Sequence, residues 1–433
     1  MRQTVALLLL GVLASGCPAA PPPPPPPPPE EEPFPPPGER ERIDAAVAPV
    51  LEGAWVSGLV VGLADSRGPR VYAYGTLDGD SVVELGSVTE VFTGLLLADA
   101  VERGLVALDD PVCKHLPPEV SFPEEITLRH LATHTAGMPR RPDNFAPADL
   151  GNPYADYTVA KLQEYLGRFR PQTPPGETFA VSNLGIAVLA QVLAPDYEAT
   201  LRERILDPLG MHHTGVAVEG LAQGHDGDLV AVGPWDFGAF VGAGGLRSTA
   251  NDLLAFLGAS LGRIETSIGS ALAAARTPLT DRMALGWQRM EDGRTLWRTG
   301  QTGGCRSFLA LDPDAGLGVV VLSDTSSDVV DQVGLVALGR QEAVELRPTV
   351  ELSTYLLDLW VGRYRLERGL YLEVKREGDH LVLISPDEPP ARLYAASAVD
   401  FYVRVSDLQI TFRDDALVLH RPNGDQTARR ARR

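Results

Sequence analysis

Apolar side chains recur every three or four positions in the stretch 84–97. They are Val88, Val91, Phe92, Leu95 and Leu96. This spacing predicts a helix that turns one apolar stripe toward a core. Ser87 stands directly before the stripe, at the predicted N-terminus of the helix. A serine in that place is either a nucleophile, whose oxyanion would lie near the positive end of the helix dipole, or an N-cap.

The residue three positions after Ser87 is Glu90, and residues so spaced share a helix face. A glutamate there completes the Ser-x-x-Glu pattern of a capping box, in which the two side chains satisfy backbone N–H groups at the helix start. Both interpretations of Ser87, the catalytic and the structural, therefore stay open at this point.

In the globular segment on either side of this helix, the apolar and polar positions predict strands at both ends and helices between them. The expected strands are Leu59 to Ala64, Arg70 to Gly75, Leu285 to Met290, Gly304 to Leu311 and Gly318 to Ser323. The expected helices beyond 87–97 are Ile126 to His134, Leu184 to Leu193 and Tyr197 to Leu206. Such an order requires one sheet assembled from the two termini of the domain.

From residue 355 onward the pattern changes to alternating apolar and polar positions, which predicts a β-rich module. Tyr371-Leu-Glu-Val-Lys-Arg and His380-Leu-Val-Leu-Ile flank a Glu-Gly-Asp turn, the sequence of a β-hairpin.

The N-terminus reads as an export signal, with Arg2, an apolar run and then Ala-Ser-Gly-Cys17. Small residues before a cysteine are typical of a bacterial lipobox, so we expect Cys17 to be lipidated; an ordinary signal peptide cleaved nearby is the alternative. Residues 18–38 are mostly proline, which predicts an extended spacer. No later run is long enough for a membrane span. The expected location is the bacterial cell envelope, lipid-anchored in the periplasm or at the outer membrane.

The 433 residues carry a net charge of −19, which argues against nucleic acid as a partner. Two cysteines remain after Cys17, namely Cys113 and Cys305. A disulfide is permitted outside the cytoplasm, but nothing in the sequence places the two together, and two free thiols are expected.

Several short motifs occur in a fixed order along the globular segment. They are Gly86-Ser-Val-Thr-Glu-Val-Phe-Thr, Leu108-Asp-Asp-Pro-Val, Leu131-Ala-Thr-His-Thr-Ala-Gly-Met-Pro, Pro175-Gly-Glu-Thr-Phe, Ser182-Asn-Leu-Gly, Ile205-Leu-Asp-Pro-Leu-Gly-Met, Ala243-Gly-Gly-Leu-Arg-Ser-Thr-Ala-Asn-Asp-Leu and Arg298-Thr-Gly-Gln-Thr-Gly-Gly. Together they resemble the serine β-lactamase-related family: class C β-lactamases, penicillin-binding proteins, D-alanyl-D-alanine carboxypeptidases and related esterases.

The resemblance implies an α+β fold, with an antiparallel sheet flanked by helices and an all-helical region. The C-terminal module resembles the small lipocalin-like β-barrel appended to many family members. We therefore expect a signal peptide over 1–17, a linker over 18–40, a β-lactamase-like domain over 41–345 and a lipocalin-like domain over 350–433.

The resemblance also assigns roles to three motifs. In the first, Ser87 takes the place of the nucleophile, and Glu90 stands where the family has lysine. In the second, Tyr-x-Asn, the chain has Val181, Ser182 and Asn183, so the tyrosine is lost. In the third, Lys-Thr-Gly, the chain has Arg298-Thr299-Gly300 and keeps a cation and a hydroxyl. Ser182, Arg298, Thr299 and Gly300 are the expected substrate-binding residues; no metal or cofactor is implied.

This chain therefore differs from the family motifs at the two proton-transfer groups, where Glu90 replaces lysine and Val181 replaces tyrosine. Loss of the base of a serine triad costs about 10⁶ in turnover, and a nearby Arg298 would keep the Glu90 carboxylate too acidic to replace it. The first hypothesis is a tethered homologue with degenerate motifs, weak or inactive, that binds a peptidoglycan-derived peptide or a small acyl ligand. The second is a working esterase, peptidase or β-lactamase acylated at Ser87, with Glu90 or His225 as an unorthodox base. A purely structural envelope lipoprotein is the third.

Overall fold

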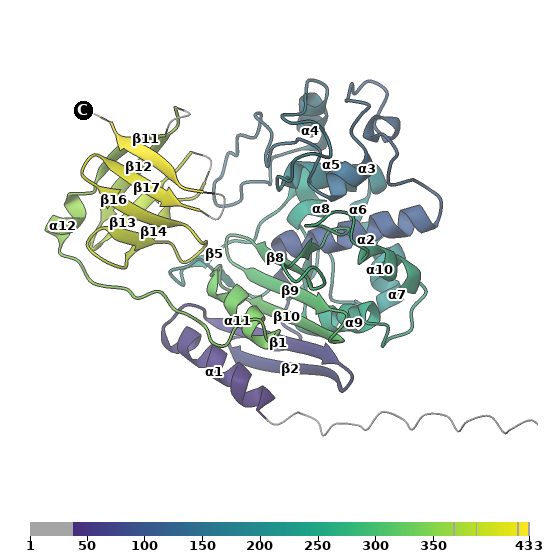
Figure 1. The fold of residues 1–433 in the computed structure, drawn as a ribbon, viewed down its shortest axis with the longest axis horizontal. Helices are drawn as coiled ribbons and strands as arrows, with labels where there is room; N and C mark the ends of the chain where they lie inside the picture. Colours follow the sequence, from purple (N-terminus) through teal and green to yellow (C-terminus); the bar gives the residue numbers. More distant parts are fainter. Residues whose placement is uncertain (1–37, 367–368, 387, 422–423, 432–433) are drawn as a thin grey trace, which may run out of the picture.

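The computed structural model describes residues 38–366, 369–386, 388–421 and 424–431. These form a helix-and-sheet domain and a separate β-barrel, shown at the left of Figure 1. The predicted signal segment 1–17, including Cys17, and nearly all of the predicted linker 18–40 lie outside the described residues. Within the described part, no helix is both long and apolar enough to span a membrane.

The sheet of the first domain has six strands in the order β2-β1-β10-β9-β8-β7, and neighbouring strands run antiparallel. Its strands are β1 (Gly58–Asp65), β2 (Gly68–Gly75), β7 (Gln288–Arg289), β8 (Leu296–Gln301), β9 (Arg306–Asp312) and β10 (Leu317–Ser323). Because β1 pairs with β10, the sheet joins the two ends of the domain, which confirms the sequence prediction.

Both faces of this sheet are covered. Successive side chains of a strand point to opposite faces, so Val319 and Val321 pack in one core while Val320 and Leu322 pack in the other. The first core contains α1 (Glu39–Glu52) and α11 (Val329–Ala337), and the second contains α9 (Ala250–Ser260) and α2 (Thr89–Glu102). Figure 1 shows this layered arrangement.

Helix α2 differs from its prediction. The spacing of its apolar residues indicated one inward stripe, but every residue from Thr89 to Ala100 is buried. The reason is that α2 packs in the same core as the sheet and also contacts α5 (Asn183–Leu193), α8 (Val241–Gly244) and α10 (Gly269–Ala275) of the helical region. That region also contains α3 (Leu128–Ala132), α4 (Val159–Leu166), α6 (Tyr197–Leu201), a π-helical turn (Arg202–Leu206) and α7 (Asp207–Leu209).

Several short elements complete the domain. They are β3 (Val83–Glu84), which pairs with β6 (Arg247–Ser248), the hairpin of β4 (Gly224–His225) and β5 (Ala231–Val232), and 3₁₀ turns at Gly86–Val88, Val112–His115 and Gly238–Phe240. The predicted strand 285–290 is shorter than expected, since only Gln288–Arg289 pairs with β8.

The C-terminal module is a closed antiparallel barrel of eight strands. After α12 (Thr354–Asp358) come β11 (Gly362–Leu366), β12 (Tyr371–Glu377), β13 (His380–Ile384), β14 (Ala391–Ala395), β15 (Asp400–Tyr402), β16 (Gln409–Arg413), β17 (Ala416–His420) and β18 (Gln426–Arg430). The β12–β13 pair is the predicted hairpin. The β-rich module is thus confirmed, while its lipocalin-like identity stays a prediction.

The barrel is fastened to the first domain by polar contacts. The Tyr394 hydroxyl donates to Asp228, and Arg392 Nη1 lies 3.1 Å from the same carboxylate. The Arg404 guanidinium lies 4.4 Å from the ring centre of Trp55 and 4.3 Å from that of Tyr394. These contacts place the loop after β15 against the first domain.

Candidate active site around Ser87

Ser87 lies in the 3₁₀ turn that leads into α2, and it is half-buried. The capping interpretation of this residue is wrong. Neither the turn nor α2 has a side-chain cap, and the N-cap position of α2 belongs to Val88. Within the described residues, the Ser87 hydroxyl makes no hydrogen bond. It is a free hydroxyl at the start of a buried helix.

The backbone around Ser87 is pressed against the end of β8. Gly86 has a φ of +50°, and a Cβ there would lie 2.4 Å from the Gln301 nitrogen. A Cβ on Gly300 would lie 1.8 Å from the Leu85 oxygen and 2.9 Å from the Ser87 nitrogen. Only glycines permit this approach. The backbone N–H groups of Ser87 and of the strand after Gly300 are consequently close, as an oxyanion hole requires.

Glu90 is fully buried and enclosed by two partners. One carboxylate oxygen pairs with the Arg298 guanidinium, and the other lies 3.1 Å from Nε2 of His134. Burial alone would raise the pKa of this carboxyl. The charge of Arg298 and the contact with His134 outweigh burial and hold the pKa of Glu90 below its usual value. Glu90 is therefore an ionised, engaged carboxylate.

The imidazole of His134 is oriented from its other side. The backbone N–H of Ser182 donates to Nδ1 of His134 over 3.2 Å. Because Nδ1 accepts a hydrogen bond, the ring proton sits on Nε2, which faces Glu90. His134 has a φ of +56°, a left-handed conformation that few non-glycine residues adopt. The contact between His134 and Glu90 was not indicated by the sequence, because nothing in the spacing links the two positions.

Arg298 projects from β8 toward α2. Its side chain is 4% exposed, and besides the pair with Glu90 its Nε donates to the Ser87 carbonyl over 3.3 Å. The guanidinium thus neutralises a carboxylate of its own chain. Thr299, the next residue, is half-buried, and its hydroxyl makes no hydrogen bond within the described part of the chain.

The second motif forms the start of α5. Val181 is 36% exposed, and Asn183 is buried as the first helical residue. Ser182 is the N-cap: its hydroxyl accepts from the Gly185 N–H over 2.9 Å and donates to the Pro139 carbonyl over 2.7 Å. The structure therefore uses the Ser182 hydroxyl to begin a helix. Its predicted role in substrate binding, like those of Arg298, Thr299 and Gly300, stays a prediction, and so does the assignment of Asn183 to the catalytic residues.

His225 does not serve Ser87 in this geometry. Its Nδ1 lies 3.1 Å from the Ser57 hydroxyl and 3.1 Å from the Asp324 carbonyl. Its backbone N–H donates to Asp324 and Gly304. These contacts hold His225 in a separate network at the end of β10, which removes the support for His225 as a substitute base.

The two cysteines and the possibility of a metal site remain. Both Cys113 and Cys305 are free thiols, as expected, and burial raises the pKa of Cys305 to about 12. Among the residues that the structure describes, no group of three or more His, Cys, Asp or Glu side chains is arranged to hold a metal ion.

Fold, motif order and the Ser87 geometry together define a serine hydrolase homologue of the β-lactamase class. The sequence profile of the Beta-lactamase family matches residues 43–341, and the chain belongs to that family.

Individual relatives agree with this assignment. A Beta-lactamase of Pseudomonas fluorescens is 26% identical over 68% of this chain and 96% of its own length. The D-alanyl-D-alanine-carboxypeptidase/endopeptidase AmpH of Escherichia coli K12 is 26% identical over 65% of this chain and 82% of its own length. The crystal structure of a class C β-lactamase from Rhodobacter sphaeroides, 26% identical, covers 69% of this chain and 98% of that one with a TM-score of 0.60.

Proposed function

We propose that this protein is a ligand-binding member of the β-lactamase family in which acyl transfer at Ser87 is suppressed. The observation that carries the proposal is the buried cluster of Glu90, Arg298 and His134. It occupies the position from which a family enzyme would activate its serine.

Activation of a serine requires a neighbouring group that accepts its proton. A useful base has a pKa near the operating pH, whereas the pKa of Glu90 lies below its usual value because Arg298 and His134 overcome the effect of burial. Both carboxylate oxygens already have partners. Proton transfer from Ser87 to Glu90 would break this buried cluster, so the reaction barrier stays high.

The position of the family tyrosine offers no substitute. Val181 has no proton to give or take, and its side chain is partly exposed. The free Ser87 hydroxyl and the close backbone N–H groups of the adjoining strand still suit recognition of a carbonyl group. The site retains the means to hold an acyl group and lacks the means to transfer it.

The ligand class follows from these groups and from the relatives. Their names include a β-lactamase and a D-alanyl-D-alanine carboxypeptidase/endopeptidase. For this chain we infer a peptidoglycan-derived peptide or a small acyl compound, bound at the cell envelope through a lipid on Cys17. Retention of the full chain in the membrane fraction, and its release on Cys17→Ser, tests the anchor.

Covalent labelling tests the suppression of chemistry. The domain would be incubated with fluorescent penicillin and with a fluorophosphonate, followed by mass spectrometry of the peptide that contains Ser87. The expected result is no adduct, and reversible binding of the penicillin that persists in Ser87→Ala. A stoichiometric adduct that disappears in Ser87→Ala would overturn the proposal and establish an active serine hydrolase, the alternative that the free hydroxyl favours.

A further inference from the structure

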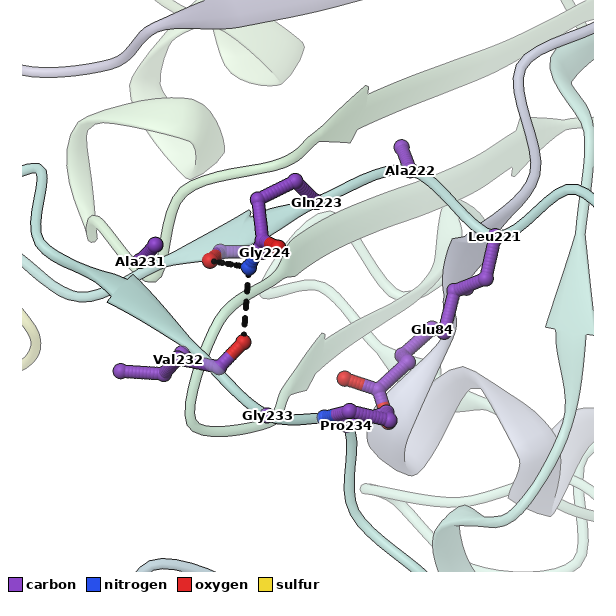
Figure 2. Close-up of a pocket in the computed structure, with 9 residues that line it drawn as sticks. All are labelled: Glu84, Leu221, Ala222, Gln223, Gly224, Ala231, Val232, Gly233 and Pro234. Carbon is purple, nitrogen blue, oxygen red and sulfur yellow. Dashed lines mark hydrogen bonds between the residues drawn. The ribbon is translucent and has the colours of Figure 1, made fainter.

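A cavity of about 460 Å³ lies beside the strand that leads to Ser87. Figure 2 shows its nine lining residues, which come from β3, the segment 221–224, and the segment 231–234. Most of the wall is apolar or backbone. Glu84 supplies the one ionisable side chain among the lining residues, and Figure 2 shows its carboxylate directed toward the space between β3 and the segment 231–234.

The polar groups of the opposite wall are already engaged. The Gln223 side-chain amide donates to the carbonyls of Gly224 and Val232, each over 2.9 Å. Leu221, Ala222 and Val232 supply apolar surface. The wall that faces Glu84 therefore brings no positive charge to it.

Glu84 is unusual among the buried carboxylates of the described residues. These are Glu39, Glu84, Glu90, Asp99, Asp252, Asp312, Asp324 and Asp328. Six of them have an arginine or histidine nitrogen within 4.0 Å. Within the described part of the chain, the two without such a partner are Glu84 and Asp324.

Asp324 and Glu84 differ in the number of hydrogen bonds that stabilise the carboxylate in place of a cationic partner. Asp324 accepts four hydrogen bonds, from Ser57, Gly58, Thr76 and Thr325. Glu84, which is 4% exposed, accepts two, from the Trp235 N–H over 2.7 Å and from the Thr302 hydroxyl over 2.8 Å. A carboxylate has about four acceptor sites, so roughly half of those of Glu84 are unused.

A buried carboxylate is costly unless a cation or several donors compensate it. Burial raises the pKa of Glu84, and the nearby charge of Asp236 acts in the same direction, so the environment disfavours the isolated anion. The two hydrogen bonds and the more distant Arg247 offset this only in part. A cationic ligand in the cavity would supply the compensation that the protein does not.

We propose that this cavity is a binding site for a small primary ammonium compound with a short apolar chain, whose charged group pairs with Glu84. The ammonium group would donate to the free acceptor sites of Glu84, and the chain would lie against Leu221, Ala222 and Val232. The site is distinct from the Ser87 hydroxyl. The cavity is nevertheless linked to the Ser87 region, because Glu84 lies three residues before Ser87 and accepts a hydrogen bond from Thr302, beyond the end of β8.

The test uses n-butylammonium as the probe and n-butanol as its uncharged analogue. Calorimetric titrations would be made with the Ser87→Ala protein, so that no covalent chemistry at that residue contributes. We expect n-butylammonium to bind at least about tenfold more tightly than n-butanol, because a hydrogen bond to a charged group is stronger than one between neutral groups. Butyrate should not bind.

Two variants locate the binding. Glu84→Gln keeps the shape of the side chain and should lower the affinity for n-butylammonium to that for n-butanol, while Glu90→Gln, a matched change of another buried glutamate, should leave the affinity unchanged. Thermal unfolding verifies that each variant is folded. Absence of n-butylammonium binding, or binding of equal strength in Glu84→Gln, overturns the proposal.

Discussion

Nε2 of His134 lies 3.1 Å from a carboxylate oxygen of Glu90, and both side chains are fully buried. The other oxygen of Glu90 pairs with Arg298 from the sheet. One carboxylate thereby joins three parts of the fold: the start of α2, the turn after α3, and β8. By the motif resemblance, Glu90 stands where the family has lysine, and in this structure that position belongs to a buried charge cluster.

The acid stability of the protein should depend on this cluster. The pKa of Glu90 is lower in the folded protein than in the unfolded chain, so its contribution is fully present above the unfolded value and is lost as the pH falls through the folded value. Glu90→Gln should therefore lower the free energy of unfolding at pH 7 and flatten its decline below about pH 4.5. Urea unfolding at a series of pH values measures this.

Glu84→Gln is the control with the opposite sign. Burial raises the pKa of Glu84 in the folded protein. At a pH above the pKa that Glu84 has in the unfolded chain, its ionisation therefore works against folding. Glu84→Gln should remove that cost and leave a smaller rise in stability on acidification from neutral pH. Identical pH profiles for the two variants would contradict the assignment of opposite pKa shifts.

The Arg298–Glu90 pair should show strong non-additivity. Arg298→Met alone leaves Glu90 as a buried charge without its main partner, and we expect a loss of about 3–5 kcal/mol in the free energy of unfolding. The double variant Arg298→Met, Glu90→Met should recover most of that loss, because both charges are then absent. A double-mutant cycle by denaturant unfolding gives the coupling energy, and simple additivity of the two changes would exclude a direct pair.

Restoring the family's proton carriers should restore some chemistry. The double variant Glu90→Lys, Val181→Tyr should hydrolyse nitrocefin or a nitrophenyl ester at least about 10²-fold faster than the parent, the usual size of a general acid–base contribution. Its matched control is Glu90→Gln, Val181→Phe, which removes the carboxylate and keeps similar volumes without supplying a base. Equal rates in the two double variants would show that loss of the base is not what limits the parent.

Because β8 lies so close to the turn that contains Ser87, Gly300 should tolerate no side chain. A Cβ at Gly300 would lie 1.8 Å from a backbone oxygen, so Gly300→Ala should destabilise the domain by several kcal/mol or prevent its folding. Gly233→Ala is the comparison, since a Cβ there has open space, and it should change the melting temperature little. Differential scanning calorimetry of the two variants decides the point.

Attachment of the barrel should depend on Arg404. Its guanidinium lies between two aromatic rings, and Nη1 donates to the Ala54 carbonyl over 3.0 Å. Arg404→Ala removes two cation–π contacts and one hydrogen bond, together worth about 1.5–3.5 kcal/mol. Hydrogen exchange should then increase in the segment 224–232 and at Trp55, with the strands of the barrel unaffected. Unchanged exchange in these segments would argue against a docking role for Arg404.

Local patterns of the sequence determined much of the architecture. Strands of alternating or apolar residues at both ends of the domain required a sheet built from its termini, and β1 does pair with β10. The hairpin of β12 and β13 followed from its turn residues, and the motif order indicated the family. These features depend on residues close in sequence or on whole-segment patterning, which the linear chain displays.

Only the tertiary structure shows the surroundings of Glu90 and Glu84. The spacing of Ser87 and Glu90 fits a capping box as well as a catalytic pair. The structure contradicts the capping box, because no side chain caps α2 and Glu90 instead pairs with Arg298 and His134 from distant segments. For Glu84, no local pattern signals a buried carboxylate that lines a cavity and lacks a cation. The energy of a buried charge depends on every group within a few ångströms, and the chain itself does not state which groups those are.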